Sequence, residues 1–463
     1  MKLFLNLSAL LFLVPSLIPH AALLAADPPE SSNRPNILLI VADDLGWSDV
    51  GWHGGFGKTP VMDRLVREGV ELDQHYVQPV CTPTRTALLS GRYPGRFGPQ
   101  ALSPSNLRAM PLGTTTLASA LKTLGYRTHL TGKWHLGARP EWIPNAYGFD
   151  TSYGTLTGAA DPWTHKYRKD SPYEDTWHRD GKFFHEEGNA TNLVAVEALR
   201  HMEPNRAPWF VYVPFHAVHT PVDAPEEFKK LYDGVQFHND PVKHESRLRM
   251  AAMVSQIDAQ IGEFVRALDS SGQRENTLII FTSDNGGIES LKNAYEGDVA
   301  DSPLNSENNP LRGQKATLYE GGTRVCAFAN WPGTLKPHKN STAMHCVDWF
   351  PTIAELTGYQ STDELRWDGI SQWSSLINGI PNDTLRNIYI AKPGEYSLRF
   401  GDWKLLQLKN GQRELFKIAD DPYEKTDLTA QQPEKVEELE RRLLAEQSRD
   451  NKLLPADLDG LPH

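Results

Sequence analysis

The clearest pattern along the chain is a series of short, continuous apolar runs rich in β-branched residues. Such runs are typical of strands buried on both faces of a parallel sheet, and helical apolar patterns lie between them. The predicted strands are Ile37–Ala42, Tyr126–Thr131, Trp209–Phe215 and Thr277–Thr282, and the predicted helices are Val61–Glu68, Thr116–Leu124, Leu193–His201 and Glu245–Leu268. This alternation predicts an α/β fold, with a mostly parallel sheet flanked by helices on both faces.

The pattern changes after about Gly369. Short strand-like runs are then separated by Gly, Asp and Asn, which favours a small antiparallel sheet. These runs are Asn387–Ala391, Tyr396–Phe400, Trp403–Leu408 and Glu414–Ile418, and a closing helix is predicted over Pro433–Gln447, packed through Val436, Leu439 and Leu443. We therefore expect a large domain over residues 27–368 and a smaller C-terminal subdomain over residues 369–463.

The first 26 residues have the order of a signal peptide. Lys2 precedes a mostly apolar run, Leu3–Ile18, and small residues lie near its end in Ala21–Ala26. This order predicts cleavage near residue 26 and export to the periplasm or the exterior. An uncleaved membrane anchor is the alternative, which the prolines in this segment disfavour. No later stretch is long and apolar enough to cross a bilayer, so no stable membrane insertion is expected.

Composition narrows the classes of function. The 463 residues carry 47 Lys and Arg against 58 Asp and Glu, a formal net charge of −11. A nucleic-acid-binding protein would normally carry a basic excess, so the charge argues against that class. A hydrophobic fraction of 39% excludes global disorder. Three cysteines cannot build a disulfide scaffold and leave one unpaired, so the odd cysteine needs an explanation.

Oxygen ligands follow two of the predicted strands. Asp43 and Asp44 come directly after the first strand, and Asp284 and Asn285 follow the run that begins at Thr277. Ligands gather beyond the carboxyl ends of strands in open α/β sheets. Carboxylate and amide oxygens suit Ca²⁺, or less readily Mg²⁺, rather than zinc or copper. For either pair alone, a turn or a helix cap is the plainer interpretation.

The odd cysteine lies in the sequence Cys81-Thr-Pro-Thr-Arg85. Pro83 near a start and Gly91 near a stop predict a short helix here. Cys81 would lie at the positive helix N-terminus, and Arg85, four residues later, can face the same site. A partly buried structural thiol is the alternative.

Cationic and titratable residues follow further predicted strands. Lys133 and His135 come after one strand and point the same way on an extended chain, His219 follows another, and Lys315 lies further along. Individually such residues are more often ordinary polar residues. Together with a dication they describe a pocket for a small tetrahedral oxyanion, which stabilises charge as a leaving oxygen departs.

Four segments together resemble the type I sulfatases: Arg34-Pro-Asn-Ile-Leu-Leu-Ile-Val-Ala-Asp-Asp, Cys81-Thr-Pro-Thr-Arg, Gly132-Lys-Trp-His-Leu-Gly and Ser283-Asp-Asn-Gly-Gly. The resemblance implies an alkaline-phosphatase-like fold and the oxidation of Cys81 to formylglycine by a formylglycine-generating or anaerobic maturation enzyme. It also implies a Ca²⁺ ion and catalytic contacts to the sulfate. The implied Ca²⁺ ligands are Asp43, Asp44, Asp284, Asn285 and the modified residue 81, and the implied sulfate contacts or proton-transfer groups are Arg85, Lys133, His135, His219 and Lys315.

Three further segments resemble the arylsulfatase B-like branch of that family: Gln78-Pro-Val-Cys-Thr-Pro, Gly148-Phe-Asp-Thr-Ser-Tyr-Gly and Pro310-Leu-Arg-Gly-Gln-Lys. That branch implies a sulfated saccharide as substrate, besides simple aryl sulfates. Trp163 and His165 lie in a loop after a strand and are candidates to contact a sugar ring, although loop packing is as good an interpretation.

Two alternatives to the sulfatase function remain at this point. One is a phosphoester or phosphonate hydrolase of the same superfamily, and the other is an exported glycan-binding protein with a dead site. If Cys81 is consumed by oxidation, Cys326 and Cys346 are left as a pair that a disulfide could join.

Overall fold

The computed structural model describes residues 34–462, apart from residues 206, 292–300, 362–364 and 381–384. The predicted signal peptide at residues 1–26 lies outside this range. Among the described residues, no helix combines the length and the apolar character needed to span a bilayer.

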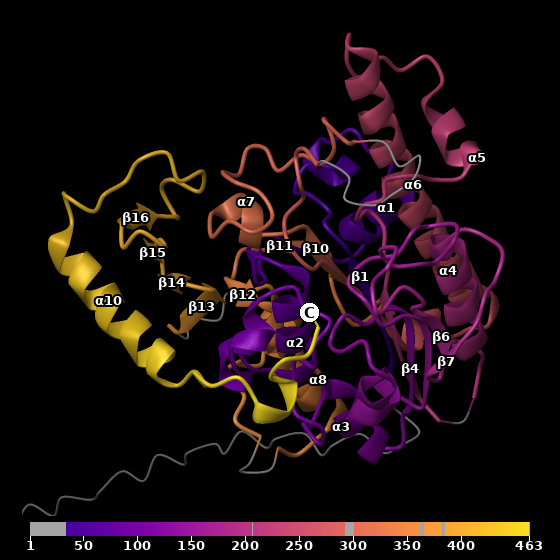
Figure 1. The fold of residues 1–463 in the computed structure, drawn as a ribbon, viewed down its shortest axis with the longest axis horizontal. Coiled ribbons are helices and arrows are strands. Elements are labelled where there is room, and N and C mark those ends of the chain that lie inside the picture. The colour runs from indigo at the N-terminus through magenta and orange to yellow at the C-terminus, as the bar shows by residue number, and fades with distance from the viewer. Residues whose placement is uncertain (1–33, 206, 292–300, 362–364, 381–384, 463) are drawn as a thin grey trace, which may run out of the picture.

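Ten of the described strands form one central sheet (Figure 1). They are β1 (Asn36–Ala42), β2 (Val70–Leu72), β4 (Arg127–Lys133), β5 (Thr151–Thr155), β6 (Trp177–Arg179), β7 (Lys182–Phe183), β8 (Trp209–Pro214), β9 (Thr277–Ser283), β10 (Ala327–Asn330) and β11 (His338–Asn340). Their order is β11-β2-β10-β9-β1-β8-β4-β5-β6-β7. The five central strands, β9 to β5 in this order, pair in parallel, and antiparallel pairs lie toward both edges. The two short strands β3 (His75–Tyr76) and β12 (Met344–His345) pair separately.

Helices cover both faces of this sheet, as the sequence predicts. The described α-helices of this part of the chain are α1 (Pro60–Arg67), α2 (Cys81–Ser90), α3 (Leu117–Thr123), α4 (Ala190–His201), α5 (Glu226–Lys229), α6 (Pro241–Ser270), α7 (Glu320–Thr323), α8 (Trp349–Thr357) and α9 (Trp373–Asn378). Side chains alternate between the faces of a strand, so β1 contributes to two cores. Leu38 and Ile40 lie in the core that includes α1, α4 and α6, whereas Leu39 and Val41 lie in the core that includes α2, α3 and α8.

Two helices start earlier than the apolar pattern predicts, because polar residues cap them. The Asp240 side chain accepts the backbone N–H groups of Val242 and Lys243, so α6 begins at Pro241 rather than Glu245. The Asn189 side chain accepts the backbone N–H of Thr191, so α4 begins at Ala190. Such caps satisfy N–H groups that lack a partner within the helix.

A separate four-stranded antiparallel sheet follows, as predicted. It consists of β13 (Asn387–Lys392), β14 (Glu395–Phe400), β15 (Trp403–Gln407) and β16 (Arg413–Lys417), in that order. The last helix, α10 (Pro433–Ser448), packs against this sheet through buried Val436, Leu439 and Leu443. Figure 1 shows the small sheet and α10 on one side of the central sheet, and α4 and α6 on the other.

The suggested disulfide between Cys326 and Cys346 is wrong. Both residues are free and buried, as is Cys81. Cys326 belongs to the core on one face of the central sheet and Cys346 to the core on the other face. The sheet therefore separates two thiols that are only twenty positions apart in sequence.

Candidate functional site

The predicted site residues converge at one edge of the central sheet. The parallel strands β1, β4, β8 and β9 all end there, so the residues at and after their ends are brought together. The strand ends place these site residues at this edge: Asp43 and Asp44 after β1, Lys133 at the end of β4, His219 after β8, and Asp284 and Asn285 after β9. Cys81 and Arg85 approach from the first turns of α2, and Lys315 from the segment before α7.

Six charges form a cluster there, five of them buried and Lys315 partly buried, which we call the charged cluster: Asp43, Asp44, Asp284, Arg85, Lys133 and Lys315. Each carboxylate is at most 1% exposed. Arg85 donates from Nε and Nη2 to one oxygen of Asp284, at 3.1 and 2.8 Å. Lys315 Nζ lies 2.6 Å from Asp44, and Lys133 Nζ contacts Asp43. Since three carboxylates face three cations, the cluster is formally neutral and can accept a dication together with an anionic substrate.

Burial and neighbouring charges oppose each other in this cluster. Burial alone would raise the pKa of Asp44, but Lys315 and His219 hold that pKa below its usual value. Burial raises the pKa of Asp284, and the charge on Asp43 raises it further, against the effect of Arg85. A bound dication would favour the ionised form of both carboxyl groups.

The residues present fit a hard cation. Asp43, Asp44, Cys81 and His219 each offer a ligand atom, and these four atoms all lie within 4.8 Å of one another. The Oδ1 atom of Asn285 is buried and accepts no hydrogen bond within the described part of the chain, while its Nδ2 donates to Asp44 at 2.7 Å. An unpartnered amide oxygen beside carboxylates is a ligand that Ca²⁺ or Mg²⁺ would satisfy.

Cys81 begins α2, and Gly91 ends the helix in the left-handed conformation, as the sequence predicts. The Cys81 thiol lies 3.4 Å from Asp43 Oδ1. A helix N-terminus favours a thiolate. Here burial raises the thiol pKa, and the charges on Asp284 and Asp43 raise it further. Unmodified Cys81 is therefore a neutral thiol at pH 7 and a weak nucleophile.

His135 does not continue the extended chain of β4. Its φ angle is 55°, so the expectation of an extended chain from Lys133 through His135 is wrong. The turn instead lays the buried imidazole ring against Gly158, where an added Cβ would lie 2.3 Å from Nε2. Burial lowers the pKa of His135, and the neighbouring Lys133 lowers it further, so the ring is neutral at pH 7.

His219 faces the charged cluster through Nε2, which lies 3.7 Å from Asp44 Oδ2. Its Nδ1 is 2.7 Å from the carbonyl oxygen of Thr220, which fixes the ring orientation. Burial lowers the pKa of His219 to about 3, although Asp44 acts in the opposite direction. Lys315, on the other side of Asp44, keeps its proton because Asp44 raises its pKa despite burial.

The two predicted sugar contacts differ in exposure. The Trp163 side chain is 42% exposed, and its indole N–H donates to Asp223, four residues after His219, at 2.9 Å. His165 is buried, stacks on Trp177 with ring centroids 4.3 Å apart, and bonds the Gly188 carbonyl at 2.9 Å. Trp163 therefore offers a free aromatic surface, whereas His165 is held within its loop.

Two features of the site had no recognisable signal in the sequence. Gly158 is required by the close approach of the His135 ring. The second is Glu320, a fully buried carboxylate five residues after Lys315, which pairs with Lys404 of the small sheet. Long-range packing creates both, so only the fold reveals them.

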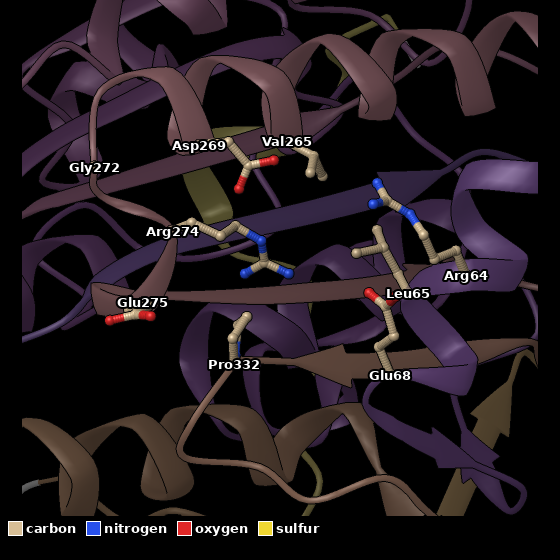
Figure 2. Close-up of a pocket in the computed structure, with 9 residues that line it drawn as sticks. All are labelled: Arg64, Leu65, Glu68, Val265, Asp269, Gly272, Arg274, Glu275 and Pro332. Atoms are coloured by element: carbon tan, nitrogen blue, oxygen red, sulfur yellow. The ribbon is translucent and has the colours of Figure 1, made fainter.

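A cavity of about 520 Å³ lies at the opposite end of β9, and Figure 2 shows its lining. Arg274 and Glu275, just before β9, line it together with residues at the ends of α1 and α6. None of the predicted site residues lines this cavity. It is therefore separate from the charged cluster.

Comparison with known proteins agrees with this geometry. The sulfatase family model matches residues 35–359. Arylsulfatase J of Mus musculus is 33% identical, over 89% of this chain and 75% of that protein. N-acetylgalactosamine-6-sulfatase of Rattus norvegicus is 32% identical, over 77% of this chain and 68% of that protein.

Among solved structures, that of Ps i-CgsB in complex with k-i-k-neocarrahexaose superposes with a TM-score of 0.80 and 29% identity. The match covers 90% of this chain and 94% of that one. The parallel sheet with its separate small antiparallel sheet is thus the fold of the sulfatases. The chain belongs to the sulfatase family and is a sulfuric ester hydrolase.

Proposed function

We propose that this protein hydrolyses sulfate monoesters on a sulfated saccharide, with formylglycine made from Cys81 and one Ca²⁺ ion. The observation that carries the proposal is the position of Cys81. Its side chain starts a helix and lies 3.4 Å from Asp43, within the influence of the charges on Lys133 and Lys315 and within 4.8 Å of a His219 ring nitrogen. A binding protein would have no use for a neutral, buried thiol at the centre of such a cluster.

The proposed Ca²⁺ ligands are Asp43, Asp44, Asp284, Asn285 and the modified residue 81. The unpartnered Asn285 oxygen and the close ligand atoms support this set. When bound, Ca²⁺ would polarise the sulfate and offset the charge of its oxygens. Arg85 orients Asp284, because its guanidinium donates two hydrogen bonds to that carboxylate and a third to the Lys133 carbonyl.

The cationic residues would hold the sulfate group. Lys133 and Lys315 are fixed by Asp43 and Asp44, so their ammonium groups need little reorganisation when an oxyanion arrives. Formylglycine at residue 81 would supply the attacking hydroxyl as its hydrate. His135, held against Gly158, would donate or accept a proton at the same centre.

A proton must reach the departing sugar oxygen, and we assign its donation to His219, which would first take up a second proton from water at Nε2, because the neutral ring carries its proton at Nδ1 against the Thr220 carbonyl. The Nδ1 contact with Thr220 leaves Nε2 pointing toward the charged cluster. Lys315 is the competing donor. His219→Ala should reduce turnover of a saccharide sulfate far more than turnover of an activated aryl sulfate, because a good leaving group needs little protonation. Equal losses on both substrates would assign the proton to another group.

A saccharide substrate is supported by the relatives. One solved structure carries a neocarrahexaose, and one curated relative is named for N-acetylgalactosamine 6-sulfate. In this chain, the exposed Trp163, whose indole N–H donates to Asp223, is suited to stack on a sugar ring. We assign His165 the role of supporting that loop.

The experiment is mass spectrometry of the tryptic peptide 68–85 from protein made in its native host, together with activity assays. An aldehyde at residue 81 and a strong preference for an aryl sulfate over the matching phosphate are expected. A preference for phosphate would indicate a phosphoester hydrolase, and an unmodified thiol without activity would indicate a glycan-binding protein. N-terminal sequencing of the exported protein would test cleavage near residue 26 by a signal peptidase.

A further inference from the structure

Lys315 lies in a tight backbone turn, residues 312–322, which we call the Lys315 turn. The Lys315 N–H donates to the Gly287 carbonyl at 3.1 Å, and the Gly286 N–H donates to the Gly322 carbonyl at 3.1 Å. The turn is closed by a bond from the Gly321 N–H to the Arg312 carbonyl at 2.7 Å. The segment therefore packs directly on the residues that follow Asp284 and Asn285.

The end of this turn, at α7, is held by charges from the C-terminal part of the chain, one on the small sheet and one just after it. Lys404 of β15 is 1% exposed, and its Nζ lies 2.9 Å from Glu320 and 2.9 Å from Glu424. Glu424 also accepts the backbone N–H of Glu320 at 2.7 Å. Glu320 and Glu424 are both fully buried. Figure 1 shows α7 beside the small sheet, where these contacts are made.

The central domain contributes the other partners of Glu320. Tyr76 donates its hydroxyl to Glu320 at 2.7 Å, and Arg324 lies 3.7 Å away. Without Lys404, two buried carboxylates would face each other with their common cation missing. Removing one partner of a buried charge pair leaves an uncompensated charge, so the surrounding backbone must move or take in water. The backbone that would move is α7 and, through it, the Lys315 turn.

We propose that Lys404 and Glu424 are positioning residues that set the place of Lys315 in the active site. They touch neither substrate nor metal ligands and act through the Glu320 end of the Lys315 turn. The small C-terminal sheet thus takes part in catalysis by fixing one of the sulfate-binding cations. This inference rests on the proposed role of Lys315 in sulfate binding.

A double-mutant cycle on the full-length protein tests the proposal. Lys404→Met should lower kcat/KM for an aryl sulfate by about 10- to 100-fold, because displacing a catalytic group by about 1 Å costs on that order. In a Lys315→Ala background, the same substitution should change kcat/KM by less than about twofold, since its effect passes through Lys315. Glu424→Gln keeps an oxygen for the Glu320 N–H and should be milder than Glu424→Ala.

Arg96→Met is the matched control. Arg96 is another buried cation that joins the two parts of the chain, through Asp368, Glu446 and Asp450, and it does not contact the Lys315 turn. Its substitution should lower Tm as Lys404→Met does, yet leave kcat/KM of the folded protein within about twofold.

If the losses of kcat/KM in Lys404→Met and Lys315→Ala are additive, or if Arg96→Met loses as much kcat/KM as Lys404→Met, the proposal is overturned. Neither result would contradict the sulfatase function. Absence of sulfatase activity in the unaltered protein would instead refute the proposed function itself. If Lys404→Met does not fold, the Glu424→Ala and Glu424→Gln pair carries the same cycle.

Discussion

Gly158→Ala offers a test of His135 that removes no functional group. A Cβ at residue 158 would lie 2.3 Å from His135 Nε2, whereas ordinary van der Waals contact begins at 3.4 Å. The imidazole must therefore move by about 1.1 Å, unless the backbone gives way. The φ angle of Gly158 lies outside the region that disfavours L-residues, so the methyl group itself is the perturbation.

A misplacement of about 1 Å can cost about 10²-fold in rate, and overpacking typically costs about 1–3 kcal/mol of stability. We therefore expect kcat/KM for an aryl sulfate to fall by about two orders of magnitude in a protein that still folds. Steady-state kinetics and a thermal melt, measured on the same preparation, separate the two effects.

Gly262→Ala, inside α6, is the control, since its Cβ would meet its nearest neighbour, a methyl group of Val61, at 3.2 Å. Kinetics close to those of the unaltered protein in folded Gly158→Ala would refute the reasoning, because His135 would then not act at the reacting centre. Further support would come from His135→Ala, in whose background Gly158→Ala should have no additional effect.

Three other predictions follow from the described contacts. Arg85→Lys keeps the charge but should lose two of the three buried hydrogen bonds that Arg85 donates. At about 1.5–3 kcal/mol for each hydrogen bond of a charged group, the free energy of unfolding should fall by about 3–6 kcal/mol. Denaturant unfolding measures this change, and an unchanged midpoint would contradict it. Burial raises the pKa of Asp258 to about 6, so the folded state holds this proton more tightly than the unfolded state does. The free energy of unfolding should therefore fall by about 3 kcal/mol as pH rises from 4 to above 6. Denaturant titrations across this range should show that fall in the unaltered protein and not in Asp258→Asn. Because Cys326 and Cys346 are free, thiol titration of the denatured, unreduced protein should detect both, and a bonded pair would show neither.

Much of the fold could be predicted from sequence because its strands are buried on both faces. The continuous run Ile37–Ala42 carries no polar residue, and it forms the middle of the central sheet as β1. The convergence of Asp43 and Asp284 follows from the same logic, since both come after adjacent parallel strands. The short strands β6 and β7, at one end of the sheet, have three and two residues and too little pattern to be recognised.

The parts that could not be predicted depend on contacts between distant segments. The left-handed turn at His135, and the buried Glu320 with its partner Lys404, follow no local pattern. The disulfide suggestion failed for the same reason, because spacing in sequence does not tell on which face of a sheet a thiol will lie. Helix starts were misplaced where a polar cap, such as Asp240, lies outside the apolar pattern.

The contacts of Glu320 also have a consequence for the order in which the protein is made. Asp43 to Lys315 leave the ribosome first, but Lys404 and Glu424 are synthesised up to 109 residues after Lys315. At about 5–20 residues per second, that interval lasts about 5 to 20 seconds. During this interval, the nascent chain contains the proposed Ca²⁺ ligands but not Lys404 and Glu424, the charged residues that hold the Lys315 turn. The active site therefore cannot reach its final form before Glu424 has been synthesised, although most of its residues are translated early.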